Sequence, residues 1–549
     1  MNFHKPLYIN SSDKTYHCAL VHWNEILRHF FMLSVSMDSY DAIVIGAGHN
    51  GLVCANYLAR KKLRVLVIEK RGVVGGACIT EELWPNVKVS TAAYVCSLLD
   101  KEIIDDLNLQ KHGFRFLVRE PPSFTPFLNG KYLFLHNDLE KSRKEIAKFS
   151  KRDAENYGNY ESSITKLAET IEPLLKQTPP KNMYGMLKFG LKNRKLLNSL
   201  TELMDFASLS VKDFLDRWFE SEELKATLAT DGIIGSFASP STPGTAYVLL
   251  HHVMGNIAGR GKWGYVEGGM GSITNALAKS AEELGVRIKT NSSVEKILIE
   301  DGKAIGVATK DGQTYRAKRI VSNAEPKLTF LNLVGEEHLS EDFLQKVRNY
   351  KTEAASFKIN LLLNGLPNFD VYPTKENKIG PHHMGTIHIC EDFEYMERAF
   401  DDAKYGRASA NPVVEMCIPS SVDKTLAPAG MYVASCFVQY TPYKLINSDW
   451  ESEKERFVDR VISTIKKYAP NMEDVIENKH ALSPIDLETE YSLTGGNIFH
   501  GDMTLNQLFL FRFNYRTPIK NLYLCGSGTH PGGGVTGLPG YNAAKEILG

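Results

Sequence analysis

Three glycines near residue 50 have a spacing that favours the binding of phosphate groups. Gly46, Gly48 and Gly51 follow a short apolar run and precede a segment whose apolar residues recur at helical spacing. The first glycine permits a tight turn, the second lets the backbone approach a pyrophosphate, and the third lets the helix pack closely on the strands. Because a helix N-terminus offers unpaired N–H groups to phosphate oxygens, we expect a dinucleotide here, with Ala47 and Asn50 also in contact with it.

The residues after the next apolar run predict which dinucleotide binds. That run ends at Glu69, whose carboxylate is placed to accept hydrogen bonds from an adenosine ribose. Lys70 follows, and Gly75, Gly76 and Ala77 let the chain pass against a cofactor that extends along the sheet edge. This favours FAD, whose ribityl chain and flavin reach beyond the pyrophosphate, over NAD. No second glycine motif of this kind follows a strand, so a resident nicotinamide site is not expected.

The C-terminal end of the chain carries a second strand–glycine–helix pattern. The apolar run 521–525 precedes the glycine-dense segment 526–540, and residues 541–548 have helical spacing. A helix N-terminus aimed at the pyrimidine edge of a flavin would stabilise negative charge on the reduced ring. We therefore expect strands from both ends of the chain in one parallel sheet, with the middle of the chain inserted between them.

The middle of the chain mixes helices with antiparallel strands. Asp-Gly pairs at 301–302 and 311–312 separate strand-like segments and predict hairpins, whereas residues 140–230 have mainly helical spacing. We predict an α/β fold in which an FAD-binding, doubly wound (Rossmann-like) domain is built from discontinuous segments and carries an inserted α+β substrate domain. The expected parts are a non-essential N-terminal extension at 1–36, an FAD-binding domain at 37–115, 255–335 and 495–549, and a substrate domain at 116–254 and 336–494.

Composition and charge exclude several functions. Among the 549 residues, 64 Lys and Arg balance 64 Asp and Glu, so no cationic surplus favours nucleic acid. No apolar run reaches the ~18–20 residues that cross a bilayer. The eight cysteines are scattered without a CxxC pair, which favours reduced thiols over a zinc or dithiol site. The N-terminus lacks the features of a secretory signal, and we expect the cytoplasm of a bacterium or the mitochondrial matrix of a eukaryote.

Five segments share their pattern with a known family: DAIVIGAGHNGLVCANYL (41–58), VIEKRGVVGGA (67–77), GYVEGGMGSITNALA (264–278), VSNAEP (321–326) and LYLCGSGTHPGGGVTGLPGYNAA (522–544). The chain resembles the FAD-dependent carotenoid and retinoid oxidoreductases, which include phytoene desaturases, carotenoid isomerases and retinol saturases. The resemblance implies FAD contacts at the glycines of both turns and at Glu69, with the adenine beside Val294. It places four further residues near the flavin: Gly526, Thr536, Gly537 and Leu538.

Three further segments match one branch of this family: KHGFRFLVREPPSFTP (111–126), HHVMGNIAGRGKWGYVEGG (251–269) and GGNIFHGDMTLNQLF (495–509). The resemblance thus covers nearly the whole chain from Met37 onward. The branch takes its name from pyridine nucleotide-disulphide oxidoreductases, but this sequence lacks the CxxC that a disulphide reductase needs.

The family acts on long apolar polyenes and often binds membranes peripherally, which implies an apolar small-molecule substrate here. We therefore expect redox chemistry at carbon–carbon bonds (desaturation, saturation or isomerisation) of an isoprenoid-like substrate by hydride transfer with flavin N5. A flavin amine oxidase and a flavin-binding regulatory protein with little turnover are the alternatives. Against amine oxidation, residues 525–534 read CGSGTHPGGG where amine oxidases typically place an acidic motif.

The remaining candidates are weaker. Hydride transfer to a flavin does not require a protein base, so no catalytic residue is predicted. His500 and His530 either line the substrate face or move a proton or, as we favour, bond to tight turns. The histidines at 382–388 fit no zinc spacing, and no metal is expected. Residues 182–204 combine Met, Phe and Leu with Lys and Arg, so this segment either covers the core or lies in a membrane interface.

Overall fold

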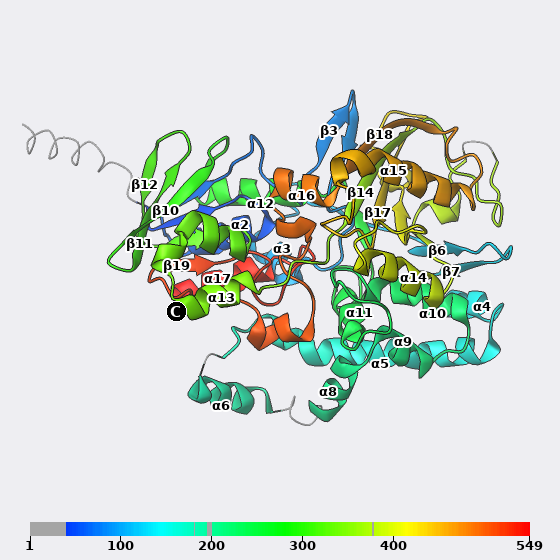
Figure 1. Cartoon of the computed structure of the whole chain (residues 1–549), viewed down its shortest axis with the longest axis horizontal. Coiled ribbons are helices and arrows are strands. Elements are labelled where there is room, and N and C mark those ends of the chain that lie inside the picture. The colour runs from blue at the N-terminus through cyan, green and yellow to red at the C-terminus, as the bar shows by residue number, and fades with distance from the viewer. Residues whose placement is uncertain (1–39, 181, 195–199, 376–377) are drawn as a thin grey trace, which may run out of the picture.

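The first sheet of the structure is assembled from distant parts of the chain. The computed structural model describes residues 40–180, 182–194, 200–375 and 378–549. Five parallel strands follow the order β19-β13-β1-β2-β9 (Figure 1). They are β1 (Ala42–Ile45), β2 (Val65–Ile68), β9 (Arg287–Lys289), β13 (Ile320–Ser322) and β19 (Leu522–Leu524). The first and last strands of this set come from opposite ends of the chain, as the sequence predicted.

Four of the five strands, β1, β2, β13 and β19, are buried along their whole length, which explains their mainly apolar sequences, whereas the edge strand β9 is partly exposed. Ala42 and Val44 of β1 belong to a core that includes residues of several helices, three of which contact the strands of this sheet, whereas Ile43 and Ile45 belong to a core shared with a small antiparallel sheet. These three helices are α2 (His49–Arg60), α12 (Gly271–Glu283) and α17 (Leu538–Leu548). The antiparallel sheet is β10 (Val294–Glu300), β11 (Lys303–Thr309) and β12 (Thr314–Arg316). It turns at the two Asp-Gly pairs, as predicted.

A second, seven-stranded sheet forms the other half of the molecule. Its order is β18-β14-β17-β16-β15-β6-β7, and among these pairs only β15 and β6 run parallel. One face packs on α15 (Trp450–Lys466) through Phe457, Val461 and Ile465. The strands are β6 (Ser123–Pro126), β7 (Tyr132–Leu135), β14 (Phe357–Leu363), β15 (Thr386–Ile389), β16 (Val414–Cys417), β17 (Tyr432–Val438) and β18 (Ile476–Leu482).

Helices surround both sheets, and Figure 1 shows most of those from the region 139–253 below the seven-stranded sheet. They are α4 (Leu139–Ile146), α5 (Lys151–Leu175), α6 (Met183–Lys192), α8 (Leu200–Ser208), α9 (Val211–Asp216), α10 (Glu222–Ala229) and α11 (Thr245–Val253). The other elements used below are α3 (Lys101–Asp106), α14 (Phe393–Lys404), α16 (Pro484–Tyr491), β5 (Phe116–Val118), β8 (Gly264–Val266) and the short η1 (Thr230–Gly232). No helix in the described part of the chain is long and apolar enough to cross a membrane.

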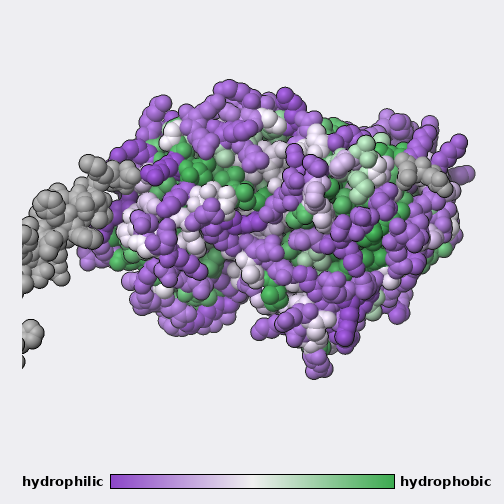
Figure 2. All heavy atoms as spheres, turned by 90° about the horizontal axis from the view of Figure 1, so that it is seen from above, coloured by the Kyte–Doolittle hydropathy of each residue, from purple (hydrophilic) through white to green (hydrophobic). Residues whose placement is uncertain are grey.

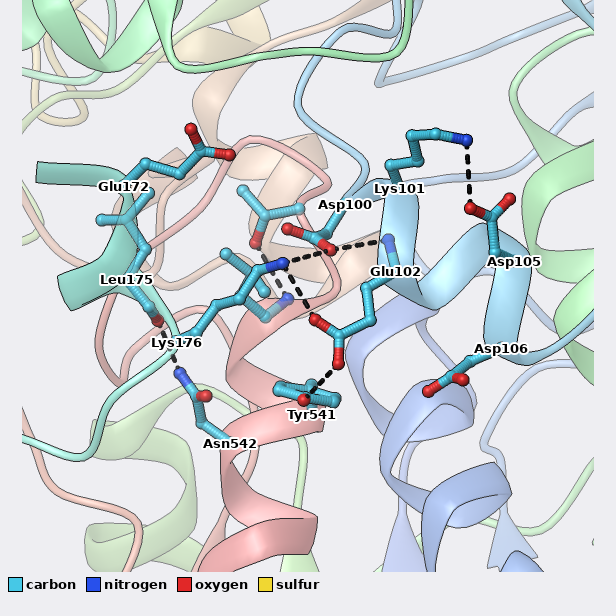
Figure 3. A network of polar contacts seen from close by, with 12 residues as sticks. Asp100, Lys101, Glu102, Asp105, Asp106, Glu172, Leu175, Lys176, Tyr541 and Asn542 are labelled. Carbon is cyan, nitrogen blue, oxygen red and sulfur yellow. Dashed lines mark hydrogen bonds and ion pairs between the residues drawn. The ribbon is translucent and has the colours of Figure 1, made fainter. Parts of the chain in front are cut away.

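The end of α5 is tied to the half of the molecule with the parallel sheet by a network of polar contacts (Figure 3). Lys176 Nζ lies 2.9 Å from Asp100 Oδ1 and 3.0 Å from Glu102 Oε2, at the N-terminus of α3. The hydroxyl of Tyr541 on α17 donates to the other oxygen of Glu102 at 2.7 Å, and Asn542 donates to the Leu175 carbonyl. This network fixes a helix of the inserted region against two elements of the half with the parallel sheet.

The fold class is therefore the predicted one: an α/β domain with a parallel sheet of discontinuous segments, which carries an inserted α+β region. The predicted domain boundaries stay predictions, and the extension at 1–36 lies outside the described residues. The face seen in Figure 2 is mainly hydrophilic, with hydrophobic residues in small groups.

Candidate functional site

One cavity of about 930 Å³ connects the glycine turn of the parallel sheet with the seven-stranded sheet. Its wall includes Gly48 and Gly75 at one end and Lys358 and Glu415 at the other. Ligand sites commonly occupy such places between domains, at the carboxyl ends of parallel strands. The cavity is therefore large enough and correctly placed to hold a dinucleotide and a second molecule together.

The N-terminus of α2 faces this cavity without a capping side chain. Gly48 is the N-cap residue, and no side chain accepts from the first N–H groups of the helix. A Cβ at Gly48 would lie 2.9 Å from Asn323 Nδ2, and one at Gly51 would lie 2.2 Å from the carbonyl oxygen of Gly46. The three glycines thus do what their spacing predicted: they allow a turn, a bare backbone surface and a close helix–strand approach.

Glu69 follows β2 and holds the turn in place. Its carboxylate accepts from the Ala47 N–H at 2.8 Å and from the Arg71 N–H at 2.9 Å, and it lies on the cavity wall. Gly75 is held against the same turn, because its N–H donates to the Ala47 carbonyl at 2.9 Å. Lys70 donates to the Ser492 hydroxyl at 2.8 Å, so α16 closes this edge of the cavity.

The structure places the predicted cofactor residues in two groups. Those on the cavity wall are Gly46, Gly48, Asn50, Glu69, Lys70, Gly75, Gly76, Ala77 and Val294. Those that stand behind the wall or beside it are Ala47, Gly51, Gly526, Thr536, Gly537 and Leu538.

At the C-terminal glycine run, the residues on the wall are neighbours of the predicted ones. Ser527, Gly534 and Val535 line the cavity, and the Asn50 amide donates to the Ser527 hydroxyl at 3.1 Å. The carbonyl of Thr536 instead accepts from Asp100 at the start of α3. Prediction from the sequence missed these wall residues because the glycine pattern identifies the segment but not which of its residues face inward.

Five buried polar atoms on the cavity wall have no hydrogen-bond partner among the described residues: Asn50 Oδ1, Arg71 Nη1, Ser123 Oγ, Glu415 Oε1 and His500 Nδ1. Buried polar groups in proteins are nearly always paired, so these atoms fit a polar ligand. Together with the uncapped N-terminus of α2 and the bare glycine surface, they match what FAD requires.

At its other end the cavity is lined by a polar row on the seven-stranded sheet. The pairing register places His388 opposite Glu415, Glu415 opposite Phe437, and Phe437 opposite Lys358. Their strand neighbours point to the apolar core beneath α15, because successive side chains alternate between faces. Sequence analysis missed this row, although single charged residues inside the apolar strands FKINLLL, VEMC and TIHI were a usable signal.

Burial changes the protonation of this row. It lowers the pKa of Lys358 to about 7, and it lowers the pKa of His388 to about 3. Burial, together with the neighbouring Asp231, raises the pKa of Glu415 to about 8. At neutral pH Glu415 is therefore mainly a neutral acid, which accepts from the Tyr94 hydroxyl at 3.2 Å.

The other candidate side chains have structural surroundings. His530 Nε2 lies 3.0 Å from the Leu174 carbonyl in the last turn of α5, so its partner is a helix end and not the predicted tight turn, whereas His500 lies on the cavity wall. The seven described cysteines are all buried and form no disulfide among themselves. Burial raises the pKa of Cys96 to about 12 and that of Cys78 further, so neither thiol is poised for attack.

The fold and this site define a class of flavoprotein. Residues 51–548 match the family described as flavin-containing amine oxidoreductase, and because the match spans most of the chain, the protein belongs to this family. It is an FAD-dependent oxidoreductase, as the glycine turns predicted.

Individual relatives are consistent with this placement. The chain is 43% identical to the mouse (Mus musculus) pyridine nucleotide-disulfide oxidoreductase domain-containing protein 2, over 93% of each chain, which is the branch that the sequence resembled. It is 26% identical to a phytoene desaturase (lycopene-forming) of Pseudescherichia vulneris, over 90% of this chain and 96% of the relative. A solved oxidoreductase of Methanosarcina mazei shares the fold, with a TM-score of 0.59 at 16% identity and coverage of 92% and 99%.

Proposed function

We propose that this FAD-dependent oxidoreductase transforms carbon–carbon bonds of a long, mainly apolar, isoprenoid-like substrate. FAD, when bound, supplies a hydride acceptor or donor at N5. The observation that carries the proposal is the single cavity, which continues from the nucleotide turn into a wall of apolar side chains such as Ile164, Ile234 and Leu249. The phytoene desaturase relative, which spans nearly the same length, supports the same substrate class.

Apolar burial is enough to hold such a substrate. Removal of apolar surface from water contributes ~25 cal/mol per Å², so a chain that buries about 400 Å² gains about 10 kcal/mol before association costs. The residues of the protein then have three tasks. They bind the substrate in one register, exclude water from the reacting bond, and hold protons on the polar row. Aromatic side chains on the wall, including Trp263 and Phe437, suit an extended polyene.

Amine oxidation is the second candidate, since the family description names it. Carboxyl groups of Asp231 and Glu415 lie on the cavity wall, where one of them could pair with an ammonium group. Against this, Arg119 and Lys358 lie on the same wall, and burial together with Asp231 holds Glu415 largely neutral. An ammonium group would therefore meet the positive charge of Arg119, while Glu415 is mainly uncharged.

The test is an anaerobic screen of the purified, FAD-loaded protein. Phytoene, squalene and geranylgeraniol are added singly to oxidised protein, and polyenes to dithionite-reduced protein, while the flavin absorbance is followed. We expect an isoprenoid to bleach the oxidised flavin or to reoxidise the reduced one. Rapid bleaching by spermine or benzylamine, with no response to any isoprenoid, would reject the proposal in favour of amine oxidation.

We also propose that α6 brings the protein to a membrane surface, from which an insoluble substrate is drawn. None of its residues is buried, and Figure 1 shows it standing away from the main body. Met183, Leu187 and Leu191 are exposed at helical spacing, beside the exposed Lys188 and Lys192. A helix with apolar and basic residues of this kind suits the interface of an anionic bilayer.

The compartment is also a proposal. Buried cysteines without disulfides among the described residues support a reducing compartment, the bacterial cytoplasm or a mitochondrial matrix. Fractionation of the source cells with an antibody to the chain would test it, and recovery from the culture medium would contradict it.

A further inference from the structure

A buried arginine lies on the cavity wall without a carboxylate partner. Arg119 directly follows β5 and is 3% exposed. Its hydrogen-bond partners in the described part of the chain are neutral: the Trp263 carbonyl at 3.3 Å, the Thr386 hydroxyl at 2.8 Å and the Cys417 thiol at 3.7 Å. Its guanidinium also lies 5.2 Å from the centre of the Tyr265 ring.

An arginine in this position is costly unless an anion pairs with it. A guanidinium stays protonated in proteins, and a buried charge without a counter-ion is strongly destabilising. The acidic groups that interact electrostatically with Arg119 are Asp231 and Glu415, since the charge of Arg119 lowers the pKa of both carboxyls. Neither makes an ion pair with Arg119 within the described residues, and burial raises the pKa of both.

A carboxyl oxygen without a hydrogen-bond partner lies on the same wall. Glu415 is 5% exposed, and its Oε1 has no hydrogen-bond partner among the described residues, while Oε2 accepts from Tyr94. A protonated carboxyl presents one donor, and a guanidinium presents several in a planar fork that matches a carboxylate. Both residues line the cavity, together with Thr386 and the neutral His388.

We propose that the substrate of this enzyme is amphipathic: an apolar chain that ends in a carboxylate, with Arg119 as the counter-ion of that carboxylate in the cavity. The inference rests on the proposed function and narrows its substrate class from isoprenoid-like compounds to isoprenoid-like acids. Arg119 acts here as a binding and positioning residue, because a fixed head group selects which carbon–carbon bond along the chain reaches the flavin. No proton or electron transfer is ascribed to it.

The test compares ligands that differ only in the head group. Farnesoic acid, methyl farnesoate and farnesol are titrated against the FAD-loaded protein by equilibrium dialysis, so that binding is measured without turnover. Because a charge-assisted, bidentate hydrogen bond is lost with the neutral groups, the acid should bind at least about tenfold more tightly than the ester or the alcohol. R119Q should remove this preference and leave binding of the alcohol within about twofold of the wild type, whereas R119K should retain part of the preference.

R456Q is the matched control, since Arg456 is an exposed arginine of α15 remote from the cavity wall, and it should keep the full preference. Equal binding of acid, ester and alcohol by the wild type would overturn the inference, as would a preference that survives in R119Q or no binding of the acid at its solubility limit. If R119Q does not retain FAD, the inference is still tested by the binding of acid, ester and alcohol to the wild type and to R119K. Flavin bleaching is recorded separately, so a failure of the head-group inference and a failure of the proposed redox function are distinguishable.

Discussion

A side chain at Gly48 would occupy the surface on which the pyrophosphate is expected. Its Cβ alone would already approach Asn323 Nδ2 to 2.9 Å. We expect Gly48→Val to fold, as judged by circular dichroism, but to lose bound FAD, measured as flavin absorbance per mole of purified protein. Gly190→Val is the control, since a Cβ there meets no atom within 4 Å, and it should stay yellow. A Gly48→Val protein with full flavin content would contradict the placement of the cofactor.

Glu415 links the polar row to a pH dependence of stability. Its pKa is raised on folding from 4.5 to about 8 by burial, so the folded state binds the extra proton between these values. Stability contributed by this group therefore falls as the pH rises through that range. We expect Glu415→Gln to melt at a higher temperature than the wild type at pH 9, with little difference at pH 5. Glu455→Gln, at an exposed site on α15, should match the wild type at both values. If the difference in melting temperature between Glu415→Gln and the wild type is the same at pH 5 and pH 9, the buried, proton-binding state of Glu415 is contradicted.

At the scale of elements, α6 offers the clearest prediction. Leu187 and Leu191 are 63% and 68% exposed, and transfer of each to a bilayer interface would contribute ~1.5–3 kcal/mol. The double variant Leu187→Glu/Leu191→Glu should therefore lose at least about tenfold in affinity for phosphatidylcholine–phosphatidylglycerol vesicles in a co-sedimentation assay. Ile446→Glu, at a comparably exposed apolar site outside the helix, is the control. Equal sedimentation of all three proteins would reject the membrane role of α6.

The elements also show how far the sequence predicts the structure. The unit from β1 to Glu69 was predictable because its strands, turn and helix follow from local sequence patterns. The C-terminal strand was predictable because a continuous apolar run of this kind is typical of a buried parallel strand. The polar row was not, since Lys358, His388 and Glu415 come from three separate strands, β14, β15 and β16. Only the pairing register brings them to one face, and no local pattern encodes that register. The wall residues of the C-terminal glycine run were missed for a similar reason, because which residue faces inward depends on packing against α3.

At the scale of the whole molecule, the network in Figure 3 joins the two halves. Lys176 contacts two carboxylates there and is about one-third exposed, so solvent screens part of the interaction. We expect Lys176→Ala to lower the free energy of unfolding by about 1 kcal/mol in a urea titration monitored by circular dichroism. Lys166→Ala, which removes a more exposed pair with Glu202 from the same helix, should have a smaller effect. A larger loss in the control would show that the network does not stabilise the contact between the halves.

The most direct test of the proposed function is the stoichiometry of a single turnover. FAD-loaded protein is mixed without oxygen with the isoprenoid that gives the largest flavin response, and the product is analysed by mass spectrometry. For desaturation, the account predicts a product that has lost two hydrogens, in an amount equal to the flavin reduced. For saturation, a product that has gained two hydrogens should match the flavin reoxidised. The account would be contradicted if no isoprenoid changes mass while an amine is converted to an imine in step with flavin reduction.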